Sequence, residues 1–274
     1  MPGDPASNLC PDCPEERIES LRVERNLDAG PQQFYLDWMG SAFSGDLGYS
    51  WKNAGTTVNS LLFEQEGVSN TLMLLGLSGL FLCIGMLLSA MGRIPSWVKA
   101  VFRVIGTIPA LVLGLGAFAF YTVNFDPNTN ETTFVQILLG ALSLALADAA
   151  LSGSIDGTDE IVSTESRRRY VQIGVLRGEK PLWNILPNTF PSLVGQLRAR
   201  LLNLVSASII IELVFKINGV GGLLFEGAVD QDFGLVLGCT FVFVLISSVL
   251  LLLQAIAEIV TAMVVRSSPK GVVE

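Results

Sequence analysis

The sequence contains no histidine among its 274 residues. Histidine is the usual general base, the commonest metal ligand and the partner of serine or cysteine nucleophiles, so those catalytic designs are excluded. Charged residues are also scarce, at 15% of the chain, against about 25% in a typical soluble domain. A phosphate-binding loop of the form G-x-x-x-x-G-K-[ST] is missing too. The chain therefore does not bind ATP through a P-loop, and we expect no cofactor in it.

Cysteine is sparse, with four residues in the chain. Cys83 and Cys239 lie in apolar runs and are interpreted as packing residues. Cys10 and Cys13 form a single C-x-x-C pair, which lacks the two further ligands that a structural zinc site needs. That pair is either a small disulfide, if the region faces an oxidising compartment, or two unpaired thiols. No metal site is expected.

Hydrophobic residues make up half of the sequence, and the mean hydropathy is +0.54. The charges crowd into a few segments and leave long uncharged runs, a pattern typical of membrane spans joined by polar loops. About 20 helical residues cross the hydrocarbon core of a bilayer. We therefore predict an all-α integral membrane protein with five transmembrane helices, over residues 67–92, 104–125, 132–147, 190–215 and 233–257.

The third and fourth predicted spans are weaker because charges interrupt them. Asp148 follows the third span, which is open to an extension to about Ser154, and the fourth contains Arg198, Arg200 and Glu212. Such side chains are expected to face protein or water rather than lipid. Asp148 has either a functional role or simple contact with interfacial water, and the two arginines are expected to snorkel toward the cytoplasm.

The loop charges predict the orientation in the membrane. Three segments are basic: residues 93–103, residues 153–189 and the C-terminal tail with Arg266 and Lys270. By the positive-inside rule these segments are cytoplasmic, and the acidic loops between them are external. The predicted organisation is an external N-terminal region (1–66), a transmembrane domain (67–265) with a cytoplasmic loop at 155–189, and a cytoplasmic tail (266–274).

The net charge of −8 comes largely from residues 1–66, which hold eleven acids and four bases. This acidic balance excludes a nucleic-acid surface, which requires clustered cations. A hydrophilic external segment needs an upstream element to carry it across the membrane, and the sequence has neither a signal peptide nor an earlier span. We therefore expect that a first transmembrane helix is missing from this sequence.

Three groups of motifs occur in a fixed order along the chain. The first joins Pro2-Gly3-Asp4-Pro5 to Tyr35-Leu36-Asp37-Trp38 and Gly45-Asp46-Leu47-Gly48-Tyr49-Ser50. The second places Leu186 and Pro187 twelve and thirteen residues after Gly174. The third joins Glu212-Leu213-Val214-Phe215 to Asn218-Gly219-Val220-Gly221, Asp232-Phe233 and Gly238. Together with the predicted topology, these motifs resemble the permease subunits of peptide/nickel-type ATP-binding-cassette (ABC) importers.

The resemblance implies a type I ABC-importer permease fold and a short cytoplasmic coupling helix that docks onto an ATPase subunit. The residues implied in this coupling are Arg168, Arg169, Tyr170, Gly174, Arg177, Leu186 and Pro187. Arg168, Arg169 and Tyr170 replace the E-A-A of the family pattern, and Tyr170 is bulkier than the usual small residue. The arginines either pair with carboxylates of the partner or only obey the positive-inside rule. We expect Gly174 to release the backbone and Pro187 to start the next helix.

The resemblance also implies an external side that docks a substrate-binding protein, formed by residues 1–66 and 216–232. The residues assigned to this side are Glu212, Phe215, Asn218, Gly219, Gly221 and Asp232. Among them, Glu212 is expected to have a structural role rather than to contact substrate. The implied partners are a second homologous permease, two ATP-binding subunits that hold ATP and magnesium, an external substrate-binding protein and the lipid bilayer.

Three alternatives remain open at this stage. An ATP-independent secondary transporter or channel would need polar or ionisable groups near the middle of the membrane, or discontinuous helices, and the uncharged spans argue against a proton relay. A degenerate permease or scaffold protein fits the altered E-A-A positions and the missing first helix. An intramembrane enzyme is disfavoured because histidines and paired carboxylates within the spans are absent from the sequence.

Overall fold

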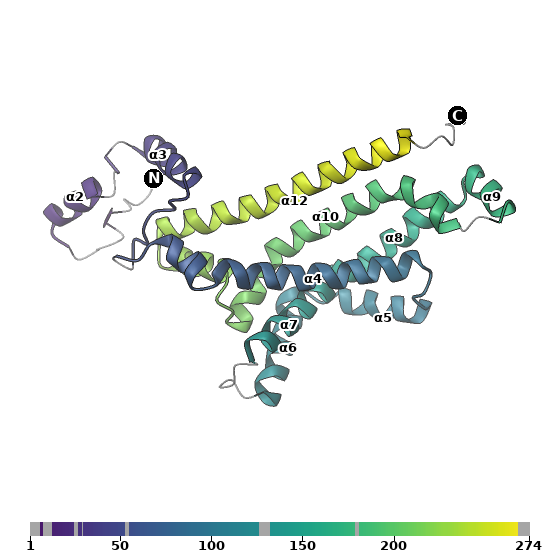
Figure 1. Ribbon diagram of the computed structural model, residues 1–274. Coiled ribbons are helices and arrows are strands. Elements are labelled where there is room, and N and C mark those ends of the chain that lie inside the picture. Colours follow the sequence, from purple (N-terminus) through teal and green to yellow (C-terminus); the bar gives the residue numbers. More distant parts are fainter. Residues whose placement is uncertain are drawn as a thin grey trace. The chain divides into compact units, whose positions relative to one another are not determined.

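A computed structural model describes residues 6–7, 13–24, 27–28, 30–52, 55–125, 132–178 and 181–267 of the chain (Figure 1). Its elements are α2 (Glu15–Glu24), α3 (Pro31–Phe43), η1 (Ser60–Glu64), α4 (Gly67–Ala90), α5 (Ser96–Gly106), α6 (Ala110–Asn124), α7 (Thr132–Leu146), η2 (Ala147–Ala149), α8 (Ala150–Ser166), α9 (Arg169–Leu176), α10 (Pro181–Phe215), α11 (Val220–Val229) and α12 (Phe233–Ser267). Within these ranges no strand occurs, only an isolated antiparallel bridge between Tyr49 and Thr57. The predicted all-α fold is confirmed.

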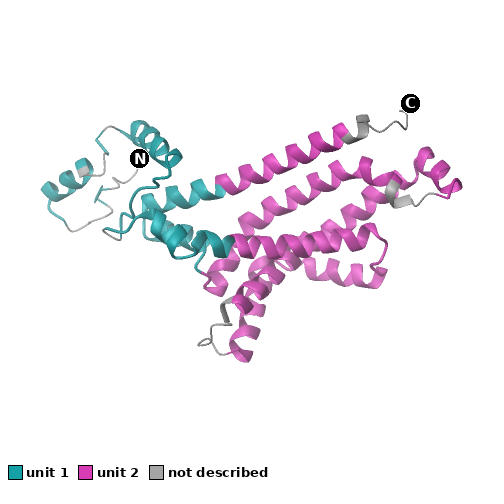
Figure 2. Ribbon diagram, viewed as in Figure 1, with its two compact units in different colours: residues 1–71, 218–243 teal, residues 72–217, 244–274 magenta. Residues whose placement is uncertain are grey.

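The chain divides into two compact units (Figure 2). Unit 1 comprises residues 1–71 and 218–243, and unit 2 comprises residues 72–217 and 244–274. Helices α4 and α12 each begin in unit 1 and end in unit 2. Most of the two segments assigned to the external side from the sequence, 1–66 and 216–232, therefore belongs to one compact unit.

Three helices are long and apolar enough to cross a membrane: Gly67–Ala90, Phe134–Ser166 and Phe233–Met263. Two further bent helix pairs, Ser96–Gly106 with Ala110–Asn124 and Asn184–Phe215 with Val220–Val229, pass the same test together. The described residues thus hold three spans, or up to five if each bent pair is one span. The predicted runs 67–92 and 233–257 correspond to α4 and α12, and α12 extends ten residues farther.

The predicted span 104–125 is wrong as a single straight helix. The chain bends by 99° between α5 and α6, and Pro109 occupies the N-cap position of α6. Proline lacks the N–H that would continue the hydrogen-bond ladder, so a helix usually ends before it. Gly106 lies at the bend, where a Cβ atom would be 2.7 Å from Ser152 Oγ of α8. The close packing of α5 on α8 therefore requires a residue without a side chain at this position.

The third predicted span continues well past Ser154, because α8 ends only at Ser166. The first part of the predicted loop 155–189 is thus helical. A kink separates α7 from α8, where Asp148 and Ala149 adopt left-handed φ values of 49° and 55°. The exposed Asp148 carboxylate accepts a hydrogen bond from Ala110 N at 3.3 Å, at the N-terminus of α6. Asp148 therefore caps a neighbouring helix as well as facing solvent.

Helix α10 begins at Pro181, so Pro187 lies inside the helix together with Pro191 and does not start it. Helices that span membranes tolerate internal proline because neighbouring groups satisfy the freed backbone atoms. The helix packs closely on α8 through glycine: a Cβ atom on Gly153 would be 2.3 Å from Arg200 Nη2. Gln196 Nε2 also donates to the carbonyl oxygens of Gly153 and Ser154, both at 3.1 Å. Arg200 and Gln196 thus contact α8.

Candidate functional site

The segment that resembles a coupling helix forms α9, a short helix between α8 and α10. One side of α9 packs inward, with Val171 and Gly174 buried. The other side carries Ile173, Val175 and Leu176, and Leu176 is 87% exposed. Exposed apolar side chains grouped on a short helix are typical of a surface that another protein covers.

Tyr170 ties this helix to both of its neighbours. Its hydroxyl donates to Glu165 Oε1 at 2.6 Å, near the end of α8, and accepts from Asn188 Nδ2 of α10 at 2.8 Å. Burial raises the pKa of the Tyr170 phenol, and its hydrogen bond to Glu165 adds to the rise. Arg168 Nε lies 3.6 Å from the other oxygen of Glu165. The bulky residue at the third E-A-A position thus braces α9 against α8 and α10.

Gly174 does not release the backbone as the sequence suggested. It lies inside α9 and is buried, so it serves as a small residue at a close contact. The chain turns instead at Gly178, where φ is +80°, directly after Arg177 at the C-cap. Leu186 and Pro187 are exposed on the first turns of α10, and Arg168 and Arg169 are exposed at the start of α9. The predicted coupling residues therefore gather around one short helix, with Gly174 beneath its surface.

The carboxylate of Asp232 accepts several hydrogen bonds within unit 1. Asp232 is only 2% exposed and precedes α12, where its Oδ1 accepts from Leu235 N at 3.1 Å as an N-cap. The same carboxylate accepts hydrogen bonds from Ser50 Oγ, from Trp51 N at 2.9 Å and from Lys52 N at 3.3 Å. Two motifs that lie far apart in the sequence, Gly45–Ser50 and Asp232-Phe233, thus meet at this side chain.

Two glycines of α12 allow the 47–58 segment to approach its helix backbone. A Cβ atom on Gly234 would be 2.2 Å from the carbonyl oxygen of Tyr49, and one on Gly238 would be 2.5 Å from Val58 Cγ1. The segment is held by backbone bonds from Ser50 N to Thr56 O and from Val58 N to Gly48 O, each 2.9 Å. Sequence reasoning identified Gly238 but missed Gly234, although the four-residue spacing signals one helix face.

The Asn218-Gly219-Val220-Gly221 motif is anchored to the start of α4. Asn218 Nδ2 donates to Gln65 O, and Asn218 O accepts from Asn70 Nδ2, both at 2.8 Å. Val220 N donates to Thr71 Oγ1 at 2.8 Å. Gly219 is the N-cap of α11, and Gly221 is buried in its first turn. These residues therefore fix the start of α11 against the start of α4 in unit 1.

Glu212 and Phe215 lie in unit 2 and are fully buried, so they do not form part of an exposed docking surface. The ring of Phe215 packs edge-on against Phe118 with centroids 5.6 Å apart. The backbone oxygen of Glu212 accepts from Ile217 N at 2.9 Å, where α10 ends. Their burial supports a structural role.

Sequence reasoning missed the ion pairs between α5 and α8. Lys99 pairs with Asp159, and Arg103 forms two hydrogen bonds with Asp156 at 2.7 and 2.8 Å. Ser89 of α4 also donates to Asp159. From the sequence, these basic residues indicate only the cytoplasmic side. Their four-residue spacing on one helix was the available signal.

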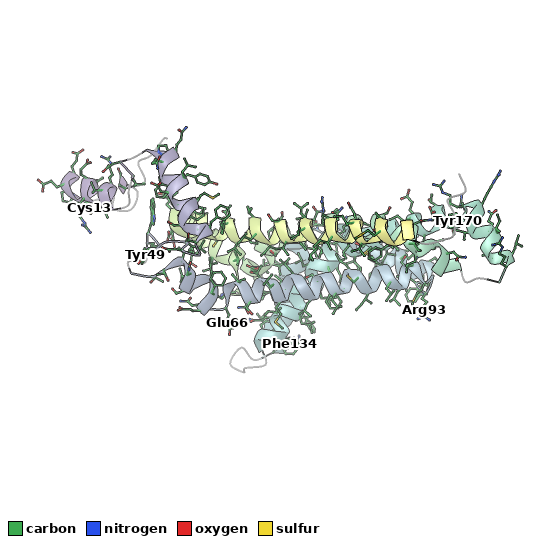
Figure 3. The ribbon with its side chains drawn as sticks, turned by 45° about the horizontal axis from the view of Figure 1, so that its top comes forward. Cys13, Tyr49, Glu66, Arg93, Phe134 and Tyr170 are labelled. Atoms are coloured by element: carbon green, nitrogen blue, oxygen red, sulfur yellow. The ribbon has the colours of Figure 1, made fainter. Side chains whose placement is uncertain are left out.

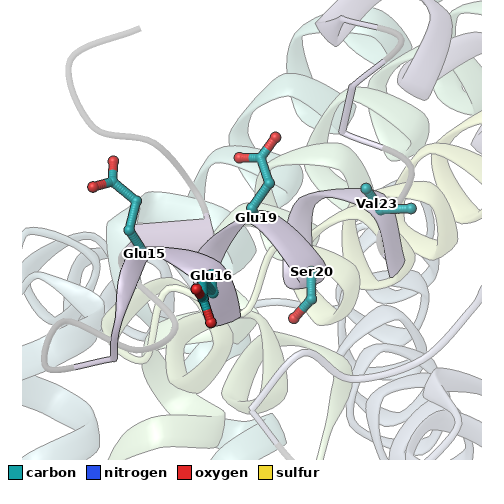
Figure 4. Close-up of a pocket in the computed structure, with 5 residues that line it drawn as sticks. All are labelled: Glu15, Glu16, Glu19, Ser20 and Val23. Atoms are coloured by element: carbon teal, nitrogen blue, oxygen red, sulfur yellow. The ribbon is translucent and has the colours of Figure 1, made fainter.

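The N-terminal motifs are only partly visible. Pro2-Gly3-Asp4-Pro5 and Cys10 lie outside the described residues. Cys13 is disulfide-bonded, whereas the buried Cys239 and the exposed Cys83 are not part of a disulfide. Among the described residues no group of three or more histidine, cysteine or acidic side chains is arranged to hold a metal ion. Helix α2 borders an open depression on the surface (Figure 4). The residues that line it are Glu15, Glu16, Glu19, Ser20 and Val23.

Comparison with known proteins agrees with the motifs. A family model described as "Binding-protein-dependent transport system inner membrane component" matches residues 168–264, from the start of α9 into α12. The chain is 26% identical to the dipeptide transport system permease protein DppB of Lactococcus lactis subsp. cremoris, over 96% of this chain and 88% of that protein. A putative peptide permease of Brucella ovis is 26% identical over 88% of this chain and 82% of its own length.

The nickel import system permease protein NikB of Staphylococcus aureus is 24% identical over 90% of this chain and 75% of its own length. The matches to DppB and NikB each extend over at least 90% of this chain. They support the importer interpretation over the secondary transporter, the scaffold and the intramembrane enzyme. By its motifs, by this family model and by these relatives, the chain is therefore similar to the permeases of peptide/nickel-type ABC importers, which are inner-membrane components of binding-protein-dependent transport systems.

Proposed function

We propose that this chain forms half of the translocation pathway for peptides or similar small solutes, in an importer driven by separate ATPase subunits. The observation that carries the proposal is α9, a braced short helix with an apolar outer surface. The names of the relatives, which mention dipeptides, peptides and nickel, support small polar solutes as the cargo.

The coupling segment transmits ATP-driven motion through rigid contacts. Leu176 and Ile173 enter an apolar groove of the ATPase subunit, while Arg169 and Arg177 pair with carboxylates at its rim. Tyr170 connects α9 to α8 and α10, so a displacement of α9 moves both long helices. Alternating access then arises because the two states of the ATPase favour two different packings of these helices.

Four kinds of partner follow from this mechanism. A second homologous permease completes the pathway, two ATP-binding subunits power it, and an external substrate-binding protein delivers the cargo. ATP and magnesium bind to the ATPase subunits, and this chain holds no cofactor. The chain catalyses no bond chemistry itself. The lipid bilayer surrounds the spans, and no nucleic acid takes part.

In this proposal residues 1–66 lie outside the cell and the C-terminal tail lies in the cytoplasm. Figure 3 supports this arrangement, since Arg93 and Tyr170 lie at the same end of unit 2. Arg93 belongs to the basic turn after α4, and Tyr170 to the arginine-rich start of α9. Two basic segments at one end are what the positive-inside rule requires of a cytoplasmic face.

The test is purification of the intact complex from its native membrane in mild detergent, followed by mass spectrometry. A second permease and P-loop ATPases at near-stoichiometric levels are expected. The complex is then reconstituted into liposomes with its binding protein, and uptake of labelled di- and tripeptides is measured with and without internal ATP. A chain that purifies without any ATPase, or uptake that is independent of ATP, would overturn the proposal.

A further inference from the structure

Helix α3 in unit 1 has one face that packs against protein. Phe34, Trp38 and Ala42 follow one another at intervals of four residues, which places them on one side of the helix. Ala42 is buried, and the ring of Phe34 lies 6.0 Å from that of Trp51. Trp38 Nε1 donates to the carbonyl oxygen of Leu47 at 3.3 Å. These contacts hold α3 firmly on the 47–51 segment.

A second face of α3 is apolar and largely exposed, with Met39 on it partly buried. Leu36, Met39 and Phe43 are three and four residues apart, so they form one stripe along the helix. Leu36 is 63% exposed and Phe43 is 73% exposed. Single apolar residues on a surface are ordinary, but a continuous stripe indicates contact with an apolar phase or a partner.

The remaining face of α3 is polar. Gln33, Asp37 and Ser41 are all exposed, and Gln33 Nε2 donates to Asp37 Oδ1 at 2.8 Å. The helix contains no lysine or arginine. Outside its protein-facing side, α3 is therefore amphipathic: it has an apolar stripe and a polar face, and neither carries a positive charge.

The rings of α3 contact the candidate membrane span of α12 near its N-terminal end. The rings of Trp38 and Phe43 lie 5.9 and 5.7 Å from that of Phe241, both edge-on. Phe241 is the ninth residue of the candidate span Phe233–Met263, which places it about 12 Å along the helix axis from Phe233 at 1.5 Å per residue.

That height corresponds to the membrane interface. The 31-residue span Phe233–Met263 is about 45 Å long, and the hydrocarbon core is about 30 Å thick. A centred span therefore extends about 8 Å beyond the core at each end. Phe241 then lies about 4 Å inside the boundary, and α3 rests beside it at the level where Trp and Tyr residues form aromatic belts.

We propose that α3 is a membrane-interface helix that inserts its Leu36–Met39–Phe43 stripe into the lipid surface. Gln33, Asp37 and Ser41 face water. The ligand is the bilayer itself, at the boundary between headgroups and acyl chains, where such helices bury their apolar face by about 5–10 Å. Because the stripe lacks cations, insertion depends on apolar contact and not on anionic lipid. The helix thereby fixes the height of the Ser50–Asp232 region above the membrane. The proposal holds for either direction of transport.

The experiment measures depth with nitroxide labels on the full-length chain in phosphatidylcholine liposomes. Single cysteines replace Leu36 and Phe43 on the stripe and Gln33 and Asp37 on the polar face, in a Cys83→Ala, Cys239→Ala background. Met39→Cys serves as a second stripe position if one variant fails to elute as a single folded species. Collision rates are recorded with oxygen, which concentrates in lipid, and with a water-soluble chromium oxalate complex.

On the stripe, the ratio of oxygen to chromium collisions should be at least about fivefold higher than at Asp37. Replacing a third of the lipid by phosphatidylglycerol should leave this ratio unchanged. Equal ratios at all four positions would place α3 in water and overturn the proposal. A stripe that is shielded from both reagents would show that a protein covers it, which would overturn the proposal equally.

Discussion

The hydroxyl of Ser50 donates a hydrogen bond to the buried carboxylate of Asp232, although 182 positions separate the two residues in the chain. The same carboxylate also accepts hydrogen bonds from the backbone N–H of Trp51, next to Ser50, and from that of Leu235 in the first turn of α12. Buried carboxylates are stable only when such donors compensate for lost hydration. Asp232 therefore joins the two halves of unit 1.

Replacing Asp232 by alanine should destabilise unit 1 strongly, because Ser50 Oγ and the N–H groups of Trp51 and Leu235 lose their acceptor. The expected cost is at least about 3 kcal/mol, since each of the three donors that loses its partner costs about 1–3 kcal/mol. Limited proteolysis within residues 45–58 would detect the loosening. Asp232→Asn is the matched control, as it retains one acceptor oxygen and should be affected less. Equal protection of the wild type and Asp232→Ala would contradict this role.

Gly234→Ala should impair folding because its Cβ would lie 2.2 Å from a backbone oxygen, a contact that no rotamer change relieves. Gly116→Ala in α6 is the control, since a Cβ there meets no atom within 4 Å. Alanine is favoured over glycine in helices by about 1 kcal/mol, so the control should be neutral or slightly stabilising. The yield of monodisperse protein after heating in detergent would compare them. Similar yields for both variants would argue against close packing of α12 on the Tyr49 segment.

Leu176→Asp should weaken binding of the ATPase subunit and uncouple ATP hydrolysis from uptake, since it places a charge on the apolar surface of α9. Val23→Asp on α2 provides a control with a similarly exposed apolar residue. Co-purification of the ATPase and peptide uptake in proteoliposomes are the two measurements. A loss of tenfold or more in binding corresponds to about 1.4 kcal/mol. If Leu176→Asp retained full coupling, α9 would not be the contact.

Tyr170→Phe should loosen α9 by removing the hydrogen bonds to Glu165 and Asn188. The side chain is partly exposed, so the expected cost is modest, about 1 kcal/mol. The raised pKa also predicts a pH effect. The contribution of Tyr170 to stability should be complete below the ordinary phenol pKa of about 10 and should be lost as pH rises through the higher folded value.

An ultraviolet titration of tyrosinate, recorded as the difference between wild type and Tyr170→Phe, would test this sign. The missing phenol should titrate above its ordinary range in the folded protein. A difference spectrum centred at or below the ordinary value would show that Tyr170 is not held by Glu165. Asn188→Ala offers a further comparison, because its amide donates to the same hydroxyl and lowers the pKa.

The sequence by itself determined the class of fold, since uncharged apolar runs such as residues 67–90 have no stable place outside a membrane or a buried core. Motif order was also sufficient to predict the family. Helix boundaries are less accessible from the sequence, because the chain bends sharply before Pro109 and because local residue preferences place Gly174 and Pro187 at helix ends, whereas both lie inside helices. Their helical conformation depends on the tertiary packing of α8, α9 and α10, which overrides local propensity.

Only the tertiary structure decided which polar groups meet. The hydrogen bonds from Ser50 to Asp232 and from Asn188 to Tyr170 join residues that no periodicity connects. Helical and strand patterns report neighbours within a few positions, whereas a buried carboxylate takes its donors from whichever segments fold against it. The sequence determined that this chain resides in a membrane, and the packing of distant segments determined where its polar contacts form.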